Sequence, residues 1–375
     1  MGGASDTKKM RIAWVDILRF LGMTLIYWGH LGPSDNVVLY IFAHHVPLFF
    51  FISGFFAVRE RKESFLSFLW RKIRSIVLPY IFFTILYYGL SLANGSLTLS
   101  SLPAALLTSA KGVRNDVPGP LWFFTCLFVV TLIYELIHRL AACIAREKGK
   151  TAVAFGLAVV VYLCGILLLG HEPAQDPAWI WNVDSACVYI FYYALGALLF
   201  PTIRKWKFAE KKISGKVCFF VFFVISILFA LFMLVDGVSF TSDVSALLNA
   251  SFGRILIFGL VTIADVVFEI YGLCCAVILI FMELCLARMI ALMPGISRFL
   301  AYVGKDSLYH CGNELLIKYF GGLLISAAGL TVIYTNDILL LLYSILCLIV
   351  LTFTLNLLER LLLGHLFRNG AISLR

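Results

Sequence analysis

The chain has 375 residues, of which 62% are hydrophobic and 14% are charged, and its net charge is +9. Roughly a quarter of the residues of a soluble chain are charged, so this composition excludes an ordinary water-soluble domain. The basic residues cluster in short loops between apolar runs, which argues against a nucleic-acid partner and indicates the cytoplasmic loops of a membrane protein.

Apolar runs near the length at which a helix crosses a bilayer recur along the whole chain. They fall at 12–30, 37–58, 75–93, 119–139, 151–170, 185–201, 217–235, 252–292, 308–333 and 338–362. We therefore expect an all-α polytopic membrane protein with about ten transmembrane helices. A single membrane-embedded domain (12–362) would lie between an N-terminal segment (1–11) and a tail (363–375).

The loops between these runs predict the orientation. Basic clusters within 8–11, 59–74, 139–150 and 204–216 alternate with the stretches 170–184 and 236–243, which have no Lys or Arg and read as outside loops. By the positive-inside rule, both termini are expected in the cytoplasm. The run 252–292 is long enough for two helices, but a single crossing keeps the later basic residues inside. Charge therefore favours ten crossings over eleven.

The first run, WVDILRFLGMTLIYWGH, carries Asp16, Arg19 and His30. A charged side chain at the bilayer centre costs about 2.5–3.5 kcal/mol. On a helix, Arg19 and His30 lie within roughly 20° of each other and roughly 16 Å apart along the axis. Asp16 shares their face and can pair with Arg19 at i, i+3. The shared face indicates a polar path; the alternative is that these residues only anchor the helix at the two membrane surfaces.

Further ionisable residues follow in the second run and after it. In IFAHHVPLFFFISGFF, His44 and His45 are expected near the outer end of the first helix, where a histidine can take a proton from a hydroxyl and return it. The segment SFLSFLWRKIRSIVLPY then presents basic side chains that are candidates for binding phosphate groups, or are ordinary cytoplasmic loop charge: Arg71, Lys72 and Arg74.

Together these motifs resemble the acyltransferase-3 family of membrane acyltransferases, whose mark is an arginine, ten residues and a histidine. Arg19 and His30 stand at that spacing. The other matching positions are His45, Pro47, Ser53 and Gly54 in the second run, Arg71, Arg74 and Pro79 after it, Trp122 in GPLWFF, and Gly304 and Ser307 in a late segment. The chain departs from the pattern at Tyr309–His310, where the family more often has Tyr-x-x-His.

The resemblance implies the O-acylation of cell-envelope sugars with acetyl-CoA from the cytoplasm, as in fucose-O-acetylase-like and other glycan O-acetyltransferases of the cell (plasma or inner) membrane. The pantetheine arm of acetyl-CoA would run past Arg19 to His30, which acts as general base or as transient acyl carrier. The implied catalytic residues are His30, Arg19 and Asp16. The candidates for binding acetyl-CoA, from the residues and the resemblance together, are Arg71, Lys72, Arg74 and Ser53, and those for the acceptor are His45, Trp122, His44 and Trp179.

Several alternatives stay open at this point. Trp179, in an outside loop, is a sugar platform or an ordinary interfacial tryptophan. A transporter or flippase for an anionic or glycan substrate would also need ionisable residues in the membrane, although the two halves show no internal repeat. A non-catalytic scaffold is a third interpretation. The ten cysteines show no ligand spacing, so we expect no metal. The acceptor glycan, the length of the acyl group and the oligomeric state stay undetermined.

Overall fold

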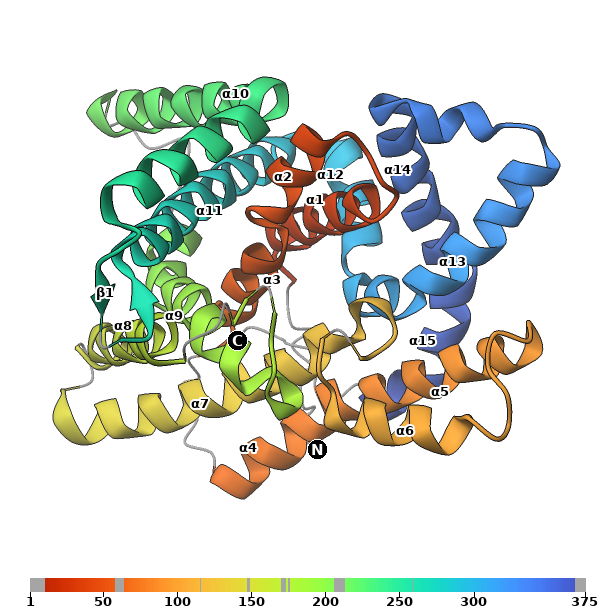
Figure 1. The fold of residues 1–375 in the computed structure, drawn as a ribbon. Coiled ribbons are helices and arrows are strands. Elements are labelled where there is room, and N and C mark those ends of the chain that lie inside the picture. Colours follow the sequence, from red (N-terminus) through yellow and green to blue (C-terminus); the bar gives the residue numbers. More distant parts are fainter. Residues whose placement is uncertain are drawn as a thin grey trace, which may run out of the picture.

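The computed structural model describes residues 11–57, 64–114, 116–146, 149–169, 173–174, 176–205, 213–257 and 259–367. Almost all of them are helical (Figure 1). The elements are α1 (Ala13–Gly29), α2 (Asp35–Phe42), α3 (His45–Gly54), α4 (Phe65–Lys72), the π-helical η1 (Ile73–Val77), α5 (Leu78–Ala93), α6 (Leu102–Lys111), η2 (Gly119–Leu121), α7 (Trp122–Ile144), α8 (Lys150–Leu168), η3 (Ile180–Asn182), α9 (Val183–Lys205), α10 (Ile213–Phe252), β1 (Leu256–Ile257), β2 (Val261–Thr262), α11 (Ile263–Ile290), α12 (Pro294–Gly304), α13 (Ser307–Ala327), η4 (Thr331–Thr335), α14 (Asp337–Phe353) and α15 (Leu355–Phe367).

Eight stretches of the described residues are helical, long and apolar enough to cross a membrane. They are Asp35–Gly54, Phe65–Ala93, Gly119–Ile144, Lys150–Leu168, Ile180–Lys205, Phe220–Phe252, Ile263–Ile290 and Asp337–Leu362. The chain is therefore an all-α, multi-pass membrane protein. Two other expected crossings correspond to α1, which has 17 residues, and to α13, which carries Glu314 and Lys318 at its middle. The number of crossings and the sidedness of the termini stay predictions.

The long run 252–292 contains one helix. Leu256 pairs with Thr262 and Ile257 with Val261 in a short antiparallel hairpin, and the 28-residue α11 follows. A capping box begins this helix: the Asp265 backbone N–H donates to the Thr262 hydroxyl, and the Asp265 carboxylate accepts from the Thr262 N–H at 3.0 Å. One helix in this run agrees with a single crossing.

The prediction of an outside loop at 236–243 is wrong, because these residues are helical. α10 continues from Ile213 to Phe252 and is interrupted only by a kink at Asp236, where φ is −140°. Apolar residues such as Val238 and Phe240 follow the kink and are exposed on the second half of the helix. Short polar residues therefore mark a kink between two helical segments here, instead of a loop.

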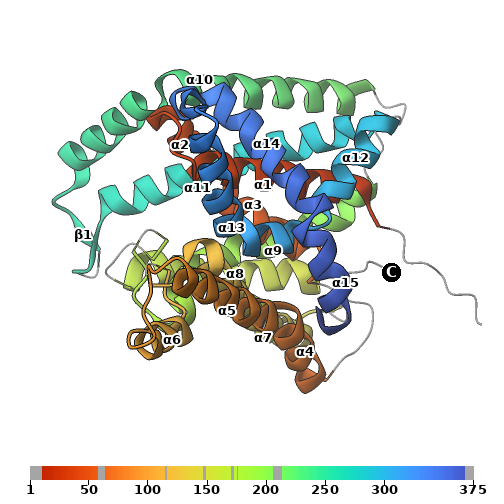
Figure 2. The same ribbon diagram turned by 90° about the vertical axis from the view of Figure 1, so that its right-hand side faces the viewer.

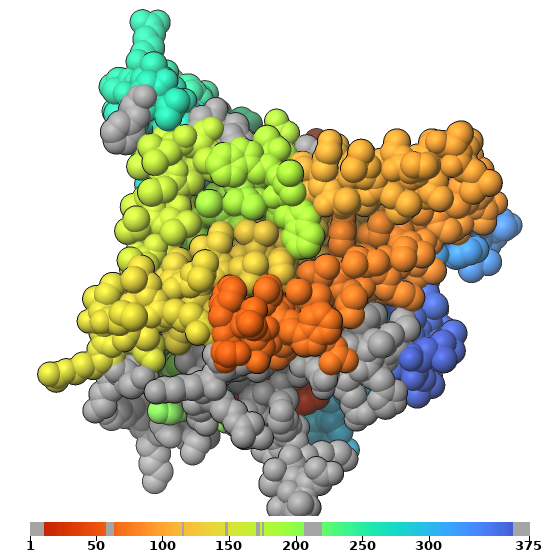
Figure 3. Space-filling model, turned by 90° about the horizontal axis from the view of Figure 1, so that it is seen from below, coloured from red at the N-terminus to blue at the C-terminus, as the bar shows by residue number. Residues whose placement is uncertain are grey.

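Small residues let the central helices approach each other closely. α3 packs closely on α9, because a Cβ atom at Gly54 would lie 1.9 Å from the Tyr193 carbonyl oxygen and one at Gly196 would lie within 3 Å of the Phe51 backbone. In Figures 1 and 2, α3 lies at the centre of the molecule, with α1 beside it and α10 and α11 above. Helices α4 to α7 form the opposite side, and Figure 3 shows that face. The contacts of α1 with α3, α12, α13 and α14 make it the central element of the site.

Candidate functional site

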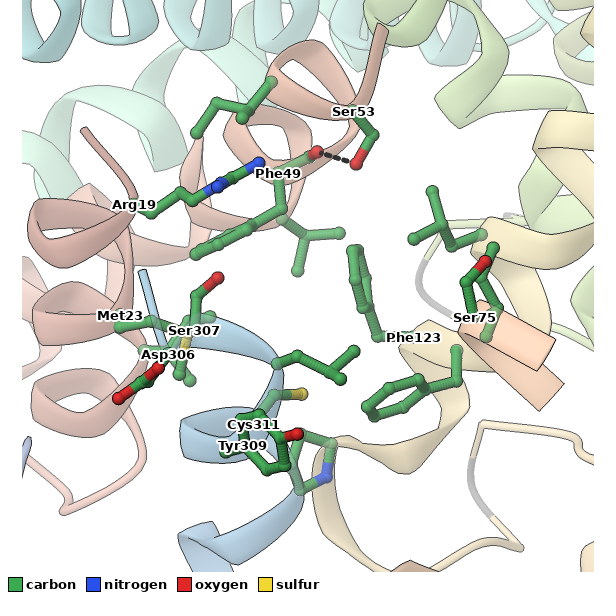
Figure 4. A pocket seen from close by; sticks show the side chains of 18 of the residues that line it. Arg19, Met23, Phe49, Ser53, Ser75, Phe123, Asp306, Ser307, Tyr309 and Cys311 are labelled. Carbon is green, nitrogen blue, oxygen red and sulfur yellow. Dashed lines mark hydrogen bonds between the residues drawn. The ribbon is translucent and has the colours of Figure 1, made fainter. Parts of the chain in front are cut away.

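A cavity of about 660 Å³ lies among helices from both ends of the chain. Its lining comes from α1, α3, α4 with η1, α7, α13 and α15, together with the segments before η2 and after α12. Figure 4 shows part of this lining, with Arg19 from α1, Ser53 from α3 and Tyr309 from α13 around one space. Segments that are distant in sequence thus share one chamber.

Six of the lining side chains are basic, and we call the part of the cavity that they line the basic end: Arg11, Arg19, Arg71, Lys72, Lys305 and Arg360. Asp16 lies behind two of them, and its carboxylate accepts from Arg11 Nε and from Arg19 Nη1, each at 2.9 Å. Because Asp16 is buried, these two bonds fix where both guanidinium groups lie. The expected pairing of Asp16 with Arg19 is therefore present.

A second carboxylate at the basic end is Asp306, in the link between α12 and α13. Arg360 Nη1 donates to both of its oxygens, at 3.0 and 2.9 Å. Burial raises the pKa of Asp306 and lowers the pKa of the neighbouring Lys305. A bound anion would counter that effect at Lys305 by favouring its charged form. With six cations against two carboxylates, the basic end suits an anionic ligand.

The middle of the cavity is apolar. The side chains there come from α1, α3 and α7, and they are Met23, Ile26, Phe49, Ile52, Phe123 and Leu127. We call this part the apolar waist. Ser53 also lines the cavity, but its hydroxyl donates to the Phe49 carbonyl at 2.7 Å, as Figure 4 shows. Its hydrogen is therefore used within α3, which makes the waist suited to an aliphatic chain.

The other end, which we call the histidine end, is formed around His30, the residue that follows α1. His30 Nδ1 lies 2.7 Å from Glu314 Oε1 on α13, and Lys318 Nζ lies 2.6 Å from the same oxygen. Lys318 also donates to the His30 carbonyl at 3.2 Å. Glu314 is 1% exposed at its side chain, whereas His30 is 29% exposed. A buried carboxylate thus holds a histidine that remains accessible from the cavity.

This contact fixes the chemistry available to the His30 ring. An ionised carboxylate only accepts hydrogen bonds, so Nδ1 carries the hydrogen and Nε2 is the basic nitrogen. Lys318 helps to keep Glu314 ionised, because opposite charges at this distance favour each other's charged form. The arrangement matches the histidine and carboxylate of a hydrolytic triad, in which the carboxylate sets the tautomer and stabilises the protonated ring.

Two other predicted residues line the histidine end. The His45 ring lies 6.2 Å from the His30 ring, centre to centre, and His45 Nδ1 donates to the Ile41 carbonyl at 2.9 Å. Trp122 begins α7 and lines the same cavity, with the Arg114 guanidinium carbon 4.6 Å from its ring centre. The structure therefore brings His45 and Trp122 to the same chamber as His30.

Of the eleven residues predicted for the site, seven line the cavity: Arg19, His30, His45, Ser53, Arg71, Lys72 and Trp122. Asp16 supports Arg19 from behind. The remaining three, Arg74, His44 and Trp179, lie outside the lining. His44 is fully buried on the far side, with Nδ1 at the Tyr40 carbonyl and Nε2 4.0 Å from Glu283, whereas Trp179 is 47% exposed.

Two residues of the histidine end were not expected from the sequence. Glu314 lies in YHCGNELL within an apolar run, and that placement alone is a signal of function in a membrane helix. Arg114 lies in the segment before η2, where no motif distinguishes it. His310 lies outside the cavity lining, and its Nε2 lies 3.0 Å from the Thr352 hydroxyl.

The described residues contain no group of three or more His, Cys, Asp or Glu that could hold a metal ion. The fold and site define a multi-pass membrane protein in which a cavity connects a basic end with a histidine held by a carboxylate. A family model for an acyltransferase domain matches residues 12–358. The chain therefore belongs to the acyltransferase-3 family, and this domain supports an acyltransferase function.

One curated protein similar to this chain is an amino-acid racemase of Enterococcus faecalis. The two are 25% identical over 170 residues, which are 42% of this chain and 23% of the racemase. The chain thus matches about a quarter of that relative's length. No solved structure matches the chain.

Proposed function

We propose that this chain is a membrane O-acyltransferase of the cell membrane that uses acetyl-CoA from the cytoplasm. It transfers the acetyl group to a hydroxyl of a cell-envelope or exported glycan on the other side. The observation that carries this proposal is the cavity itself, which has cations at one end, a histidine–carboxylate pair at the other and an apolar waist between them. These three parts correspond to the phosphates, the reacting thioester and the pantetheine arm of the donor.

In this proposal, acetyl-CoA lies in the cavity with its phosphates at the basic end and its thioester at the histidine end. The phosphates of acetyl-CoA need cations, which the basic end supplies through Arg71, Lys72 and Arg360 among others. The axial distance from Arg19 to His30 is roughly 16 Å along α1, which is comparable to the extended pantetheine arm. The thioester therefore reaches the histidine end when the phosphates lie at the basic end.

The transfer proceeds through His30 as general base. His30 Nε2 takes the proton of the acceptor hydroxyl while the oxygen attacks the thioester carbonyl carbon, and Glu314 stabilises the charged ring. The tetrahedral intermediate then collapses: the C–S bond breaks, the new C–O ester bond remains, and the proton on Nε2 passes to the departing thiolate. Ester and CoA thiol are the products, and the ring returns to its starting state.

Transfer of label tests this proposal. Membrane vesicles holding wild type, His30→Ala or the double variant Arg71→Gln/Lys72→Gln receive acetyl-CoA labelled in the acetyl group and an extract of envelope glycans. We expect ester-linked label with wild type, none with His30→Ala, and a raised KM for acetyl-CoA with the double variant. His138→Ala, on α7 outside the cavity lining, controls for the loss of a histidine. CoA release that is unchanged in His30→Ala would refute the mechanism, and a wild type that releases no CoA with any extract would favour transport.

A further inference from the structure

Arg114 is a cation at the histidine end and is not one of the six basic side chains proposed to hold the donor's phosphates. It is half-buried, lines the cavity and places its guanidinium carbon 4.6 Å from the centre of the Trp122 ring. The group is close enough to His45 to act on it electrostatically. Its Nη1 donates to the Ala174 carbonyl. Within the described part of the chain, no carboxylate forms an ion pair with Arg114.

The backbone that carries Arg114 is fastened by a residue in a strained conformation. Asn182 has φ of 55° and is fully buried, and its side-chain oxygen accepts from the Arg114 N–H at 2.8 Å. Its Nδ2 donates to the Gly112 carbonyl at 2.7 Å and to the Thr125 hydroxyl at 2.9 Å. One buried amide thus ties the segment before η2 to α7.

The neighbouring residue adds a second tie and further strain. Trp181 has φ of 58°, a left-handed conformation that is unusual for a bulky residue, and its Nε1 donates to the Ala110 carbonyl at 2.9 Å. Gly112 also has a positive φ, and a Cβ atom there would lie 2.8 Å from Thr125 Cγ2. Backbone strain like that of Trp181 persists where the surrounding structure enforces it, and it concentrates at ligand clamps and active sites. The segment is therefore built to hold Arg114 in one place.

A guanidinium has five N–H donors in a planar fork that matches a carboxylate or a phosphate. In Arg114 the described contacts use one nitrogen, Nη1. Because the donor's phosphates belong at the basic end, an anion at the histidine end must come from the other substrate. We infer that Arg114 binds a carboxylate or phosphate of the acceptor close to the hydroxyl that is acylated. This inference rests on the proposed function, and it means that the acceptor is an anionic glycan.

A different role for Arg114 makes a different prediction. If its guanidinium stabilised the oxyanion of the tetrahedral intermediate, its loss would lower kcat for every acceptor, charged or neutral. If it binds an anion on the acceptor, its loss raises KM for charged acceptors alone. The separation of kcat from KM across matched acceptors therefore distinguishes the two roles.

The experiment uses the purified full chain in lipid nanodiscs, labelled acetyl-CoA and three acceptor probes that share the same ring hydroxyls at positions 2, 3 and 4. They are methyl glucoside, methyl glucuronide and methyl glucoside 6-phosphate. For wild type we expect kcat/KM for at least one anionic probe to exceed that for methyl glucoside by about 10- to 100-fold, the effect of a charged hydrogen bond. Arg114→Gln should abolish this preference with kcat unchanged, and Arg114→Lys should retain part of it.

Asn182→Ala should weaken the same preference, because Asn182 positions Arg114. Lys111→Gln, an exposed substitution at the end of α6, should leave it intact and serves as the matched control. The inference is overturned if wild type shows no preference, if Arg114→Gln keeps it, or if kcat falls equally for all probes.

Thermal stability gives a readout that needs no turnover. An anionic probe should raise the Tm of wild type more than methyl glucoside does and should lose that effect in Arg114→Gln. Equal shifts for all probes in wild type would also overturn the inference. Release of CoA with envelope extract is measured on the same preparation, so a failure of the anion preference is separated from a failure of the acyltransferase proposal.

Discussion

The contact between Glu314 and His30 supports a quantitative prediction about catalysis. Glu314→Gln keeps the size and shape of the side chain but removes the charge that stabilises the His30 ring once it holds the acceptor's proton. We therefore expect kcat to fall while KM for acetyl-CoA stays near its wild-type value, because the proposed phosphate site lies at the other end of the cavity. Protein yield should be little affected, since an amide can still accept from His30 Nδ1.

The size of the effect follows from the geometry. Two unit charges about 4 Å apart interact by about 4 kcal/mol at an effective dielectric constant of about 20. Lys318 Nζ, 2.6 Å from Glu314 Oε1, already offsets part of this charge, and the His30 side chain is 29% exposed to screening. If about half of the interaction remains, kcat falls about 30-fold, since each 1.36 kcal/mol changes a rate tenfold.

The assay is the release of CoA thiol by purified protein at saturating acetyl-CoA with an active acceptor extract. Glu135→Gln is the matched control, because Glu135 pairs with Arg139 at 2.7 Å on α7 outside the cavity lining. It should retain wild-type kcat. A Glu314→Gln variant with wild-type kcat would refute the reasoning, as would a variant that changes only KM for the donor.

Three further predictions follow from the packing and the charges. Gly54→Leu should lower the Tm measured by thermal shift, because an added Cβ atom would lie 1.9 Å from the Tyr193 carbonyl oxygen. Gly89→Leu should not lower the Tm, because the space around its Cβ position is open. Equal Tm values for the two variants would contradict the close packing at Gly54. His45→Gln should lower kcat, because His45 lines the cavity, whereas His44→Gln should leave kcat unchanged, because His44 does not line it. If CoA release fell more in His44→Gln than in His45→Gln, the assignment of His45 to the site would be wrong. Added salt should raise KM for acetyl-CoA but not for acetyl-pantetheine, which lacks the phosphates. If KM rose equally with salt for both donors, the basic end would not bind the phosphates of the donor.

Much of the site could be predicted from the sequence, because helical periodicity shows which residues share a face. The spacing of Arg19 and His30 places both on one face of any helix, so their common path was predictable without a structure. The Ser53 and Trp122 motifs could likewise be assigned to the site by their resemblance to the family. His44 and His45 show the limit of this reasoning, because adjacent residues on a helix face different directions and only packing decides which one lines the cavity.

Contacts between segments that are distant along the chain could not be predicted from the sequence. Glu314 meets His30 across 284 residues, and one chain gives no means to pair them. Arg114 depends on a strained turn around Asn182, which follows from contacts with α6 and α7 and not from local preference. The helical residues after Asp236 look like a loop in the sequence because Asp, Gly and Ser are typical of loops, while the surrounding apolar residues continue the helix.

The apolar waist has a consequence for the membrane as an electrical barrier. In the proposed function, the pantetheine arm passes through the cavity from one compartment to the other, and the empty cavity must not conduct protons or ions. Hydrophobic constrictions in channels lose their water and then block ions. Met23, Phe49 and Phe123 give the waist the apolar lining that such a barrier needs. In the proposed function, the same surface that accepts the aliphatic part of the donor also preserves the membrane potential between turnovers. Polar substitutions in the waist would dissipate that potential even where acyl transfer survives.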